Sequence, residues 1–165
     1  MEEIFKRVSV RNYEKRAVEP EKVTQILKAA MAAPSALNQQ PWEFYVVTDR
    51  EKTELLSKCS PYSSCAAKAP LIIVPCFRTA GNSSPEFNMI NMSIATENIL
   101  LEVTALGLGA VWLSLAPFED RMEKAEKIMN IDKNILRPFA LVPIGYPVKR
   151  REQQNRFDES RIHYI

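Results

Sequence analysis

The residues best suited to binding an anion lie near the N-terminus, in the segment Arg7-Val8-Ser9-Val10-Arg11. In an extended chain alternate side chains point to the same face, so this spacing would bring Arg7, Ser9 and Arg11 together. Two guanidinium groups and a hydroxyl suit a phosphate, which accepts paired, charge-assisted hydrogen bonds from arginine. The alternative is a solvated basic face that follows a short helix, and the spacing alone favours that alternative.

A second candidate is the segment at residues 33–42, where Pro34 and Pro41 bracket small and amide-bearing residues. Residues of these types leave an irregular backbone with free donors and acceptors. Such a loop, held by a helix before it and a strand after it, often contacts ligands. The composition by itself favours the simpler interpretation, a helix-ending turn whose Trp42 covers the core.

The third candidate, residues 107–114, begins with Gly-Leu-Gly and continues into an apolar stretch. A glycine directly after a long helix is typical of a left-handed C-cap that leads into a strand. The sequence alone therefore indicates a structural role. Three polar residues of the preceding helix, Asn91, Glu97 and Asn98, are likewise expected to be partners on a helix face rather than catalytic groups.

Cysteine and histidine counts exclude several kinds of chemistry. The three cysteines, Cys59, Cys65 and Cys76, have spacings that match no zinc site and no C-x-x-C redox pair. With His163 as the one histidine, a histidine-rich metal site is impossible. No P-loop, complete dinucleotide-binding glycine motif or G-x-S-x-G nucleophile motif is present. We therefore expect any enzymatic chemistry to come from a bound organic cofactor. The alternative is a thiol-based redox protein that uses Cys59 and Cys65, although these two cysteines do not form the C-x-x-C motif typical of such proteins.

The composition is typical of a globular chain. Its 165 residues suit a single domain spanning residues 1–165, because single cores commonly reach roughly 100–200 residues. The 22 basic and 20 acidic side chains nearly balance, which excludes a disordered chain and a broad electrostatic surface for nucleic acid or an anionic membrane. The N-terminal Met-Glu-Glu carries no charged-then-apolar leader, so we expect a cytoplasmic protein.

Alternating helical and extended patterns predict an α+β or α/β domain in which helices cover a mixed sheet. Helices are expected at residues 2–7, 20–33, 50–58, 88–106 and 119–129, and strands at 44–48, 71–77, 110–115 and 140–144. Residues 79–87 are turn-forming and predict a loop. The helix at 88–106 is apolar over most of its circumference but contains polar residues, so we expect burial, partly by a second subunit, and no membrane span.

Taken together and in this order, the motifs resemble the nitroreductase family of flavin mononucleotide (FMN) enzymes. The resemblance includes R-x-S-x-R followed by Asn12-Tyr13, the A-P-S-A-x-N-x-Q-P-W loop, and Ala-Leu-Gly-Leu-Gly-Ala-Val-Trp at residues 105–112. It continues through Pro-Ile-Gly-Tyr-Pro at 143–147 and Arg-Phe-Asp-Glu-Ser-Arg-Ile-His at 156–163. It therefore covers nearly the whole chain.

The resemblance implies an α+β, nitroreductase-like fold with a central mixed, mainly antiparallel sheet flanked by helices. It also implies a homodimer with FMN at the subunit interface. Arg7, Val8, Ser9 and Arg11 match cofactor-binding positions around the FMN phosphate, and Arg156 matches a second phosphate contact, with Arg161 as a helper. The loop that the other subunit lays against the flavin, and the strand beside the flavin ring, are matched by Pro34, Ser35, Ala36, Asn38, Val111, Trp112 and Leu113.

The resemblance further implies an NAD(P)H-dependent flavin oxidoreductase that reduces small acceptors such as nitroaromatics or quinones by a ping-pong mechanism. The cofactor carries the chemistry, so no catalytic side chain and no metal site is expected, and His163 is expected to be an ordinary tail residue. The alternative is a non-enzymatic flavin-binding carrier or redox-responsive protein.

Two features depart from the common family pattern. Ser114 stands where many relatives carry glycine, and the short span between Leu115 and Pro138 leaves a more open pocket. Reductive dehalogenation and flavin fragmentation are enzymatic alternatives on the same scaffold. Those reactions usually need additional lid residues, and no segment of this sequence supplies them.

Overall fold

Strand β2 (Leu71–Arg78) forms the centre of the sheet in the computed structural model, which describes residues 2–81, 84–149 and 151–165. Residues 71–77 are all buried, as the continuous apolar run predicts. β2 pairs antiparallel with β1 (Trp42–Val47), β5 (Leu136–Pro138) and β6 (Ala140–Gly145). β6 also pairs antiparallel with two short strands, β3 (Gly109–Ala110) and β4 (Leu113–Ser114). The expected mainly antiparallel sheet is confirmed.

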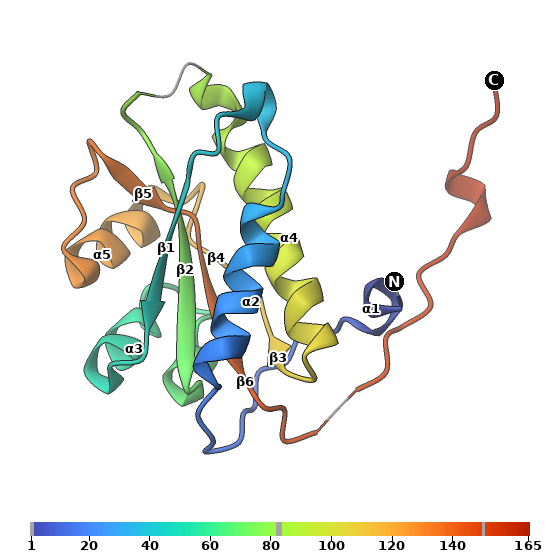
Figure 1. The fold of residues 1–165 in the computed structure, drawn as a ribbon, viewed down its shortest axis with the longest axis horizontal. Helices are drawn as coiled ribbons and strands as arrows, with labels where there is room; N and C mark the ends of the chain where they lie inside the picture. Colours follow the sequence, from blue (N-terminus) through green and yellow to red (C-terminus); the bar gives the residue numbers. More distant parts are fainter. Residues whose placement is uncertain (1, 82–83, 150) are drawn as a thin grey trace.

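Helices cover both faces of this sheet (Figure 1). α2 (Pro20–Met31) and α4 (Asn88–Ala105) pack against each other on one face. α3 (Arg50–Leu56) and α5 (Glu119–Met129) lie on the opposite face. The short helix α1 (Glu3–Lys6) packs beside α4. The predicted α+β domain with helices flanking a sheet is therefore confirmed.

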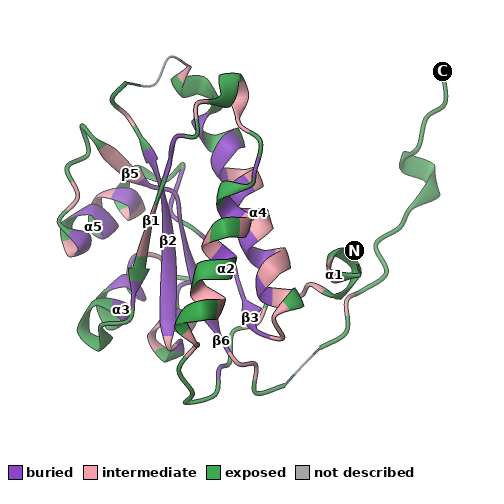
Figure 2. Ribbon diagram, viewed as in Figure 1, coloured by how far each residue is buried: buried purple, intermediate pink, exposed green. Residues whose placement is uncertain are grey.

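The core consists of two hydrophobic clusters. Side chains alternate along a strand, so the neighbours Ile72 and Ile73 of β2 enter different clusters. Ile73 packs with Ile26 of α2 and Ile99 of α4, whereas Ile72 belongs to the cluster that contains Leu56 of α3. Figure 2 shows the buried strands enclosed by helices whose outer faces are exposed.

Helix boundaries follow local signals in the sequence. The side chain of Asp49 accepts a hydrogen bond from the N–H of Lys52 and caps α3. After α4, Gly107 has a φ of 73°, and the N–H groups of Gly107 and Leu108 bond back to carbonyls of the last turn. This arrangement is a Schellman motif, so the predicted glycine C-cap is confirmed. α5 has the predicted bounds, and the other long helices end one or two residues early.

The single strand predicted at residues 110–115 is wrong. β3 ends before Val111, and β4 starts after Trp112. The register of the pairs on either side places Val111 opposite Pro143 of β6. Proline has no N–H with which to continue a ladder, so the strand is interrupted there.

Smaller differences occur elsewhere in the chain. The strand predicted at residues 44–48 occupies 42–47, and β5 was missed because its three residues show no clear period. Within the predicted loop at 79–87, residues 82–83 lie outside the described residues and Pro85–Phe87 forms a 3-10 turn. Over the part of the chain that the structure describes, no helix is long and apolar enough to cross a membrane.

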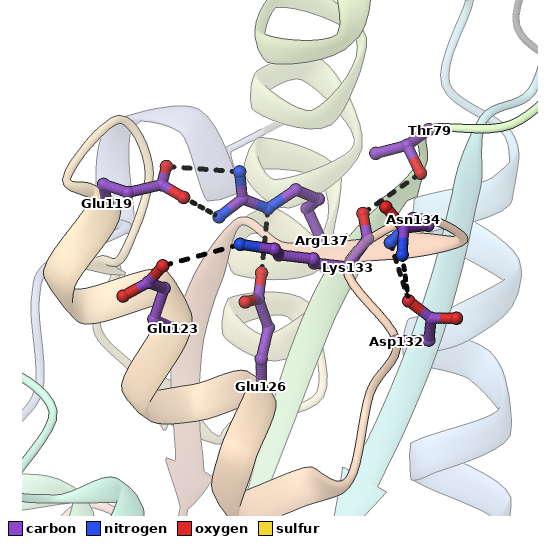
Figure 3. Close-up of polar contacts among 8 residues, drawn as sticks. All are labelled: Thr79, Glu119, Glu123, Glu126, Asp132, Lys133, Asn134 and Arg137. Carbon is purple, nitrogen blue, oxygen red and sulfur yellow. Dashed lines mark hydrogen bonds and ion pairs between the residues drawn. The ribbon is translucent and has the colours of Figure 1, made fainter.

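An ion-pair network joins β5 to α5 (Figure 3). The Nε of Arg137 donates to Glu126 Oε1 at 2.8 Å, and its two terminal nitrogens donate to Glu119 at 2.8 and 3.2 Å. The side chain of Glu126 is only 6% exposed, whereas that of Glu119 faces solvent. A buried carboxylate is costly unless it is paired, so Arg137 supports the packing of α5 on the sheet.

We expect Arg137→Met to lower the free energy of unfolding by about 3 kcal/mol, because it leaves the buried Glu126 carboxylate without its partner. Glu119→Gln, the control on the exposed side of the same guanidinium, should cost clearly less. Urea unfolding of both variants checks this comparison. The double variant Arg137→Met, Glu126→Leu should recover much of the loss; no recovery would contradict the argument from the buried charge.

Candidate functional site

The N-terminal segment that follows α1 is bound to the edge of the sheet. Ser9 forms a parallel bridge with Ala110, and the N–H of Val10 donates to the Ala110 carbonyl at 2.8 Å. This approach requires Gly109, since a Cβ at that position would lie 2.7 Å from the Cβ of Val10. The extended segment therefore runs directly beside β3.

A pocket of about 340 Å³ lies on one side of this segment. Its lining carries three cationic side chains, Arg11, Lys149 and Arg151, together with the hydroxyl-bearing Ser9. We call it the cationic pocket; the residues that line it are Ser9, Val10, Arg11, Asn12, Val148, Lys149 and Arg151. Among the residues that the structure describes, its lining contains no acidic side chain, so it offers charge-assisted donors to an anion such as a phosphate.

A second pocket, of about 380 Å³, includes Val8 and Val10 in its lining. It is bounded by Phe5 of α1 and by Leu108, which precedes β3. Ser9 and Arg11 line only the cationic pocket, Val8 lines only the second one, and Val10 lines both. The shared pocket of Ser9 and Arg11 agrees with the side-chain alternation of an extended segment.

Arg7 does not join Ser9 and Arg11 in the cationic pocket, although the sequence predicted that all three side chains would share one face. Its Nε lies 3.7 Å from Glu97 Oε1 on α4, and its side chain is 17% exposed. Burial raises the pKa of Glu97, and the charge of Arg7 opposes that rise. Arg7 is not among the residues that line the cationic pocket, so the structure brings Ser9 and Arg11 together there and directs Arg7 to α4.

The two asparagines of α4 that the sequence analysis singled out, Asn91 and Asn98, also connect structural elements. The Oδ1 of Asn91 accepts the N–H of Ala36 at 3.0 Å, and the Nδ2 of Asn98 donates to the Ala29 carbonyl of α2 at 3.0 Å. Together with the Arg7–Glu97 pair, these contacts agree with the prediction of helix-face partners.

The loop at residues 34–38 lies at the N-terminal end of α4. Asn91 holds Ala36, the hydroxyl of Ser35 accepts the N–H of Gln40, and Asn38 has a φ of 52°. The extended segment lies near the other end of the helix, where Thr104 lines the second pocket beside Val8. Asn91 and Thr104 are about 20 Å apart along α4 by the usual rise per residue. One protomer therefore does not bring the loop to the cationic pocket.

The interruption between β3 and β4 leaves Val111 and Trp112 outside both strands. Val111 and Leu113 are buried, and Trp112 packs edge-on against Phe139 with ring centroids 5.3 Å apart. The backbone of Val111 and Trp112 therefore lies outside the ladder with β6. Ser114 is exposed, and its carbonyl accepts a hydrogen bond from Arg121 Nη1 at 3.2 Å.

Arg156 lies on the C-terminal arm, residues 151–165, which runs away from the sheet (Figure 1). The arm is attached at its base, where the Nε2 of Gln153 donates to the carbonyls of Ile4 and Arg7 at 3.1 and 3.0 Å. Residues 154–165 are exposed, as Figure 2 shows. Within the arm Arg161 pairs with Asp158 at 3.0 Å, so the structure directs this arginine to its own segment.

Thiol and metal chemistry gain no support from the geometry. Burial raises the pKa of Cys59 to about 11 and raises that of Cys76 as well. The pKa of Cys65 is also raised by burial, although Arg11 opposes the change. Reactive thiolates need lowered pKa values, so these cysteines are poor nucleophiles at neutral pH. Among the described residues, no group of three or more His, Cys, Asp or Glu side chains could hold a metal ion.

Sequence reasoning missed the second wall of the cationic pocket, which Val148, Lys149 and Arg151 provide. The available signal was the basic run directly after Tyr146-Pro147. A run of charges usually marks a solvated face, and only the fold places this one opposite Ser9 and Arg11.

Several known proteins are similar to this chain in sequence and in fold. The profile of the nitroreductase family matches residues 4–61 and 59–146. A "Putative NADH dehydrogenase/NAD(P)H nitroreductase" of Methanothermobacter thermautotrophicus is 39% identical over 163 residues, which cover 99% of this chain and 85% of that protein. A solved "Putative NADH Oxidase" of Clostridium acetobutylicum is 43% identical with a TM-score of 0.94, covering 98% of this chain and 97% of that one. A structure from Desulfovibrio desulfuricans, solved in complex with FMN, is 27% identical with a TM-score of 0.85, covering 99% and 95%.

Proposed function

This chain belongs to the nitroreductase family, and from that premise we propose that it is an FMN-dependent oxidoreductase. It uses NAD(P)H to reduce small acceptors such as nitroaromatics or quinones. The observation that carries the proposal is the cationic pocket next to the interrupted strand, because one protomer thereby places phosphate donors near a segment whose backbone lies outside the sheet ladder.

The residues of the site fit FMN. Arg11, Lys149 and Arg151 supply positive charge and hydrogen-bond donors for the phosphate, and Ser9 supplies a hydroxyl. Arg7 enters the proposal through the backbone of the same segment, which its side chain ties to Glu97 of α4 and its carbonyl ties to Gln153 of the arm. Arg156 belongs to the same proposal, as a phosphate contact carried by the arm.

The flat flavin ring needs a partly apolar wall and backbone donors. The segment Val111-Trp112-Leu113 offers both, since it is largely buried and its first two residues lie outside the ladder with β6. We propose that this segment lies beside the ring. The exposed Ser114 follows it directly and borders the same region.

When bound, FMN supplies the redox chemistry, taking electrons from NAD(P)H and passing them to the acceptor. The chain's own side chains bind and orient the cofactor, and none of them is required as a nucleophile. The poorly ionised cysteines agree with this division of roles. We also propose a ping-pong mechanism, in which the oxidised nucleotide leaves before the acceptor binds in the same place over the flavin ring.

We further propose a homodimer with FMN at the subunit interface. The loop carrying Pro34, Ser35, Ala36 and Asn38 lies too far from the cationic pocket of its own protomer, so a second copy must supply it. Exposed apolar side chains surround this loop at the ends of α2 and α4, which is typical of a protein–protein contact. They are Met31, Leu37, Phe87, Met89 and Ile90.

The experiment that tests the function is the visible absorption spectrum of the purified protein, followed by anaerobic addition of NADH or NADPH. We expect flavin absorption that bleaches with at least one nucleotide and returns when a quinone is added. A protein that takes up no FMN would contradict the proposal. A protein that binds FMN but never bleaches would be a flavin carrier instead.

For the phosphate site, we expect Arg11→Ala to weaken FMN binding by about 1.5–3 kcal/mol, or about 10- to 150-fold in the dissociation constant, because a charge-assisted bond is lost. Lys127→Ala, which removes an equal charge from the exposed face of α5, is the control and should leave FMN binding unchanged. Titration of the apoprotein with FMN measures both. An unchanged constant for Arg11→Ala would remove this residue from the site.

For the dimer, we expect Leu37→Glu to produce monomers that lose FMN, since Leu37 is 77% exposed and projects from the proposed interface loop. Leu55→Glu makes the same change on the exposed face of α3 and should leave a loaded dimer. Sedimentation at micromolar concentration distinguishes the two species. A wild-type monomer that retains FMN would refute the shared site.

A further inference from the structure

We infer that Tyr13 is a positioning residue for the cationic pocket: its buried hydroxyl fastens one wall of the pocket to the central sheet and thereby sets the affinity for the phosphate of the cofactor. The inference rests on the proposed function, because it takes FMN as the occupant of the pocket. It goes further by assigning a specific task to a residue that lines neither pocket.

The two walls come from opposite ends of the chain. One wall is residues 9–12, and the other is formed by residues 148, 149 and 151. Tyr13 and Pro147 form an antiparallel bridge directly behind the pocket. Two backbone hydrogen bonds flank it, from the N–H of Val148 to the Asn12 carbonyl at 3.2 Å and from the N–H of Glu14 to the Tyr146 carbonyl at 2.8 Å. The spacing of the walls therefore depends on this short paired segment.

The Tyr13 side chain extends this connection into the core. The residue is 8% exposed, and its single hydroxyl proton is shared between the Val10 carbonyl at 2.6 Å and the Pro143 carbonyl at 3.1 Å. Val10 belongs to the first wall, and Pro143 belongs to β6. One hydroxyl thus fastens the first wall to the central sheet.

Pro143 explains why a side chain performs this task. Its missing N–H interrupts the ladder beside Val111, so the neighbouring strand is absent at this point. The Pro143 carbonyl is buried and needs a donor, which Tyr13 supplies. Gly145 packs closely between Pro70 and the phenol ring, because a Cβ there would lie 2.7 Å from Pro70 Cδ and 3.1 Å from Tyr13 Cδ1.

The phenol remains a donor over the whole ordinary pH range. Burial raises the pKa of Tyr13, with a smaller contribution from Cys65, and the charge of Arg11 opposes the rise. Deprotonation would place a negative charge among buried carbonyl oxygens, which is strongly unfavourable. The hydroxyl therefore keeps its proton at neutral pH, and the attachment does not act as a pH switch.

Removal of this hydroxyl should affect the phosphate half of the cofactor and spare the ring half. In Tyr13→Phe the ring still fills its space, but the carbonyls of Val10 and Pro143 lose a shared donor. The wall carrying Ser9 and Arg11 then becomes free to shift against Lys149 and Arg151. The segment at Val111 and Trp112, which we place beside the ring, keeps its own packing against Phe139.

The test compares FMN with riboflavin, which has the same ring and no phosphate. Fluorescence titrations of the flavin-free, full-length protein give both dissociation constants. We expect Tyr13→Phe to weaken FMN binding about tenfold, the effect of one lost hydrogen bond between buried groups, and to leave riboflavin binding unchanged. Tyr45→Phe, at a half-buried tyrosine on β1, is the matched control and should change neither constant.

Each outcome decides the matter. Equal weakening of FMN and riboflavin would show a merely structural role and overturn the inference, as would two unchanged constants. A wild-type protein that binds FMN no better than riboflavin would instead contradict the phosphate pocket of the proposed function. Amide hydrogen exchange supplies a second measurement: Val10, Glu14 and Val148 should exchange faster in Tyr13→Phe, and unchanged rates would also overturn the inference.

Discussion

The site depends on the close contact between Val10 and Gly109. A side chain at position 109 would place its Cβ 2.7 Å from that of Val10, so only glycine lets the N-terminal segment lie against β3. The hydrogen bond from Val10 to Ala110 follows from that contact. It sets the face to which Ser9 and Arg11 point, because side chains alternate along an extended chain. The cationic pocket, and with it the proposed FMN site, requires this one packing constraint.

Pro143 has two effects in the same region. It interrupts the ladder of β6 beside Val111 and Trp112, the segment that we propose to lie next to the flavin ring. Its carbonyl then becomes the acceptor for the buried Tyr13 hydroxyl. A single residue without an N–H thus connects the ring half of the proposed site to its phosphate half. The energetic reason is the same in both places, since buried backbone groups need partners and proline changes which partners are available.

Two other groups of predicted site residues, Arg7 and the loop around Ser35, lie away from the cationic pocket of their own protomer. Arg7 is held against Glu97 on α4 rather than in the cationic pocket, and its carbonyl supports Gln153 at the base of the arm. The loop around Ser35 lies at the far end of α4. The long helix therefore separates, within one protomer, two features that the proposed site combines. The proposed dimer follows from this separation, and it also accounts for the apolar surface next to the loop.

Local signals in the sequence determined much of the fold. The apolar run of β2, the Asp49 cap and the Gly107 C-cap were all predicted, because each depends on residues within a few positions of one another. The order of the motifs also indicated the family. Only the tertiary structure decided where the strand after Gly109 breaks, which partner Arg7 takes and what forms the second pocket wall. Those outcomes depend on contacts between residues far apart in the chain, such as Val111 opposite Pro143, and periodicity and capping contain no information about such pairs.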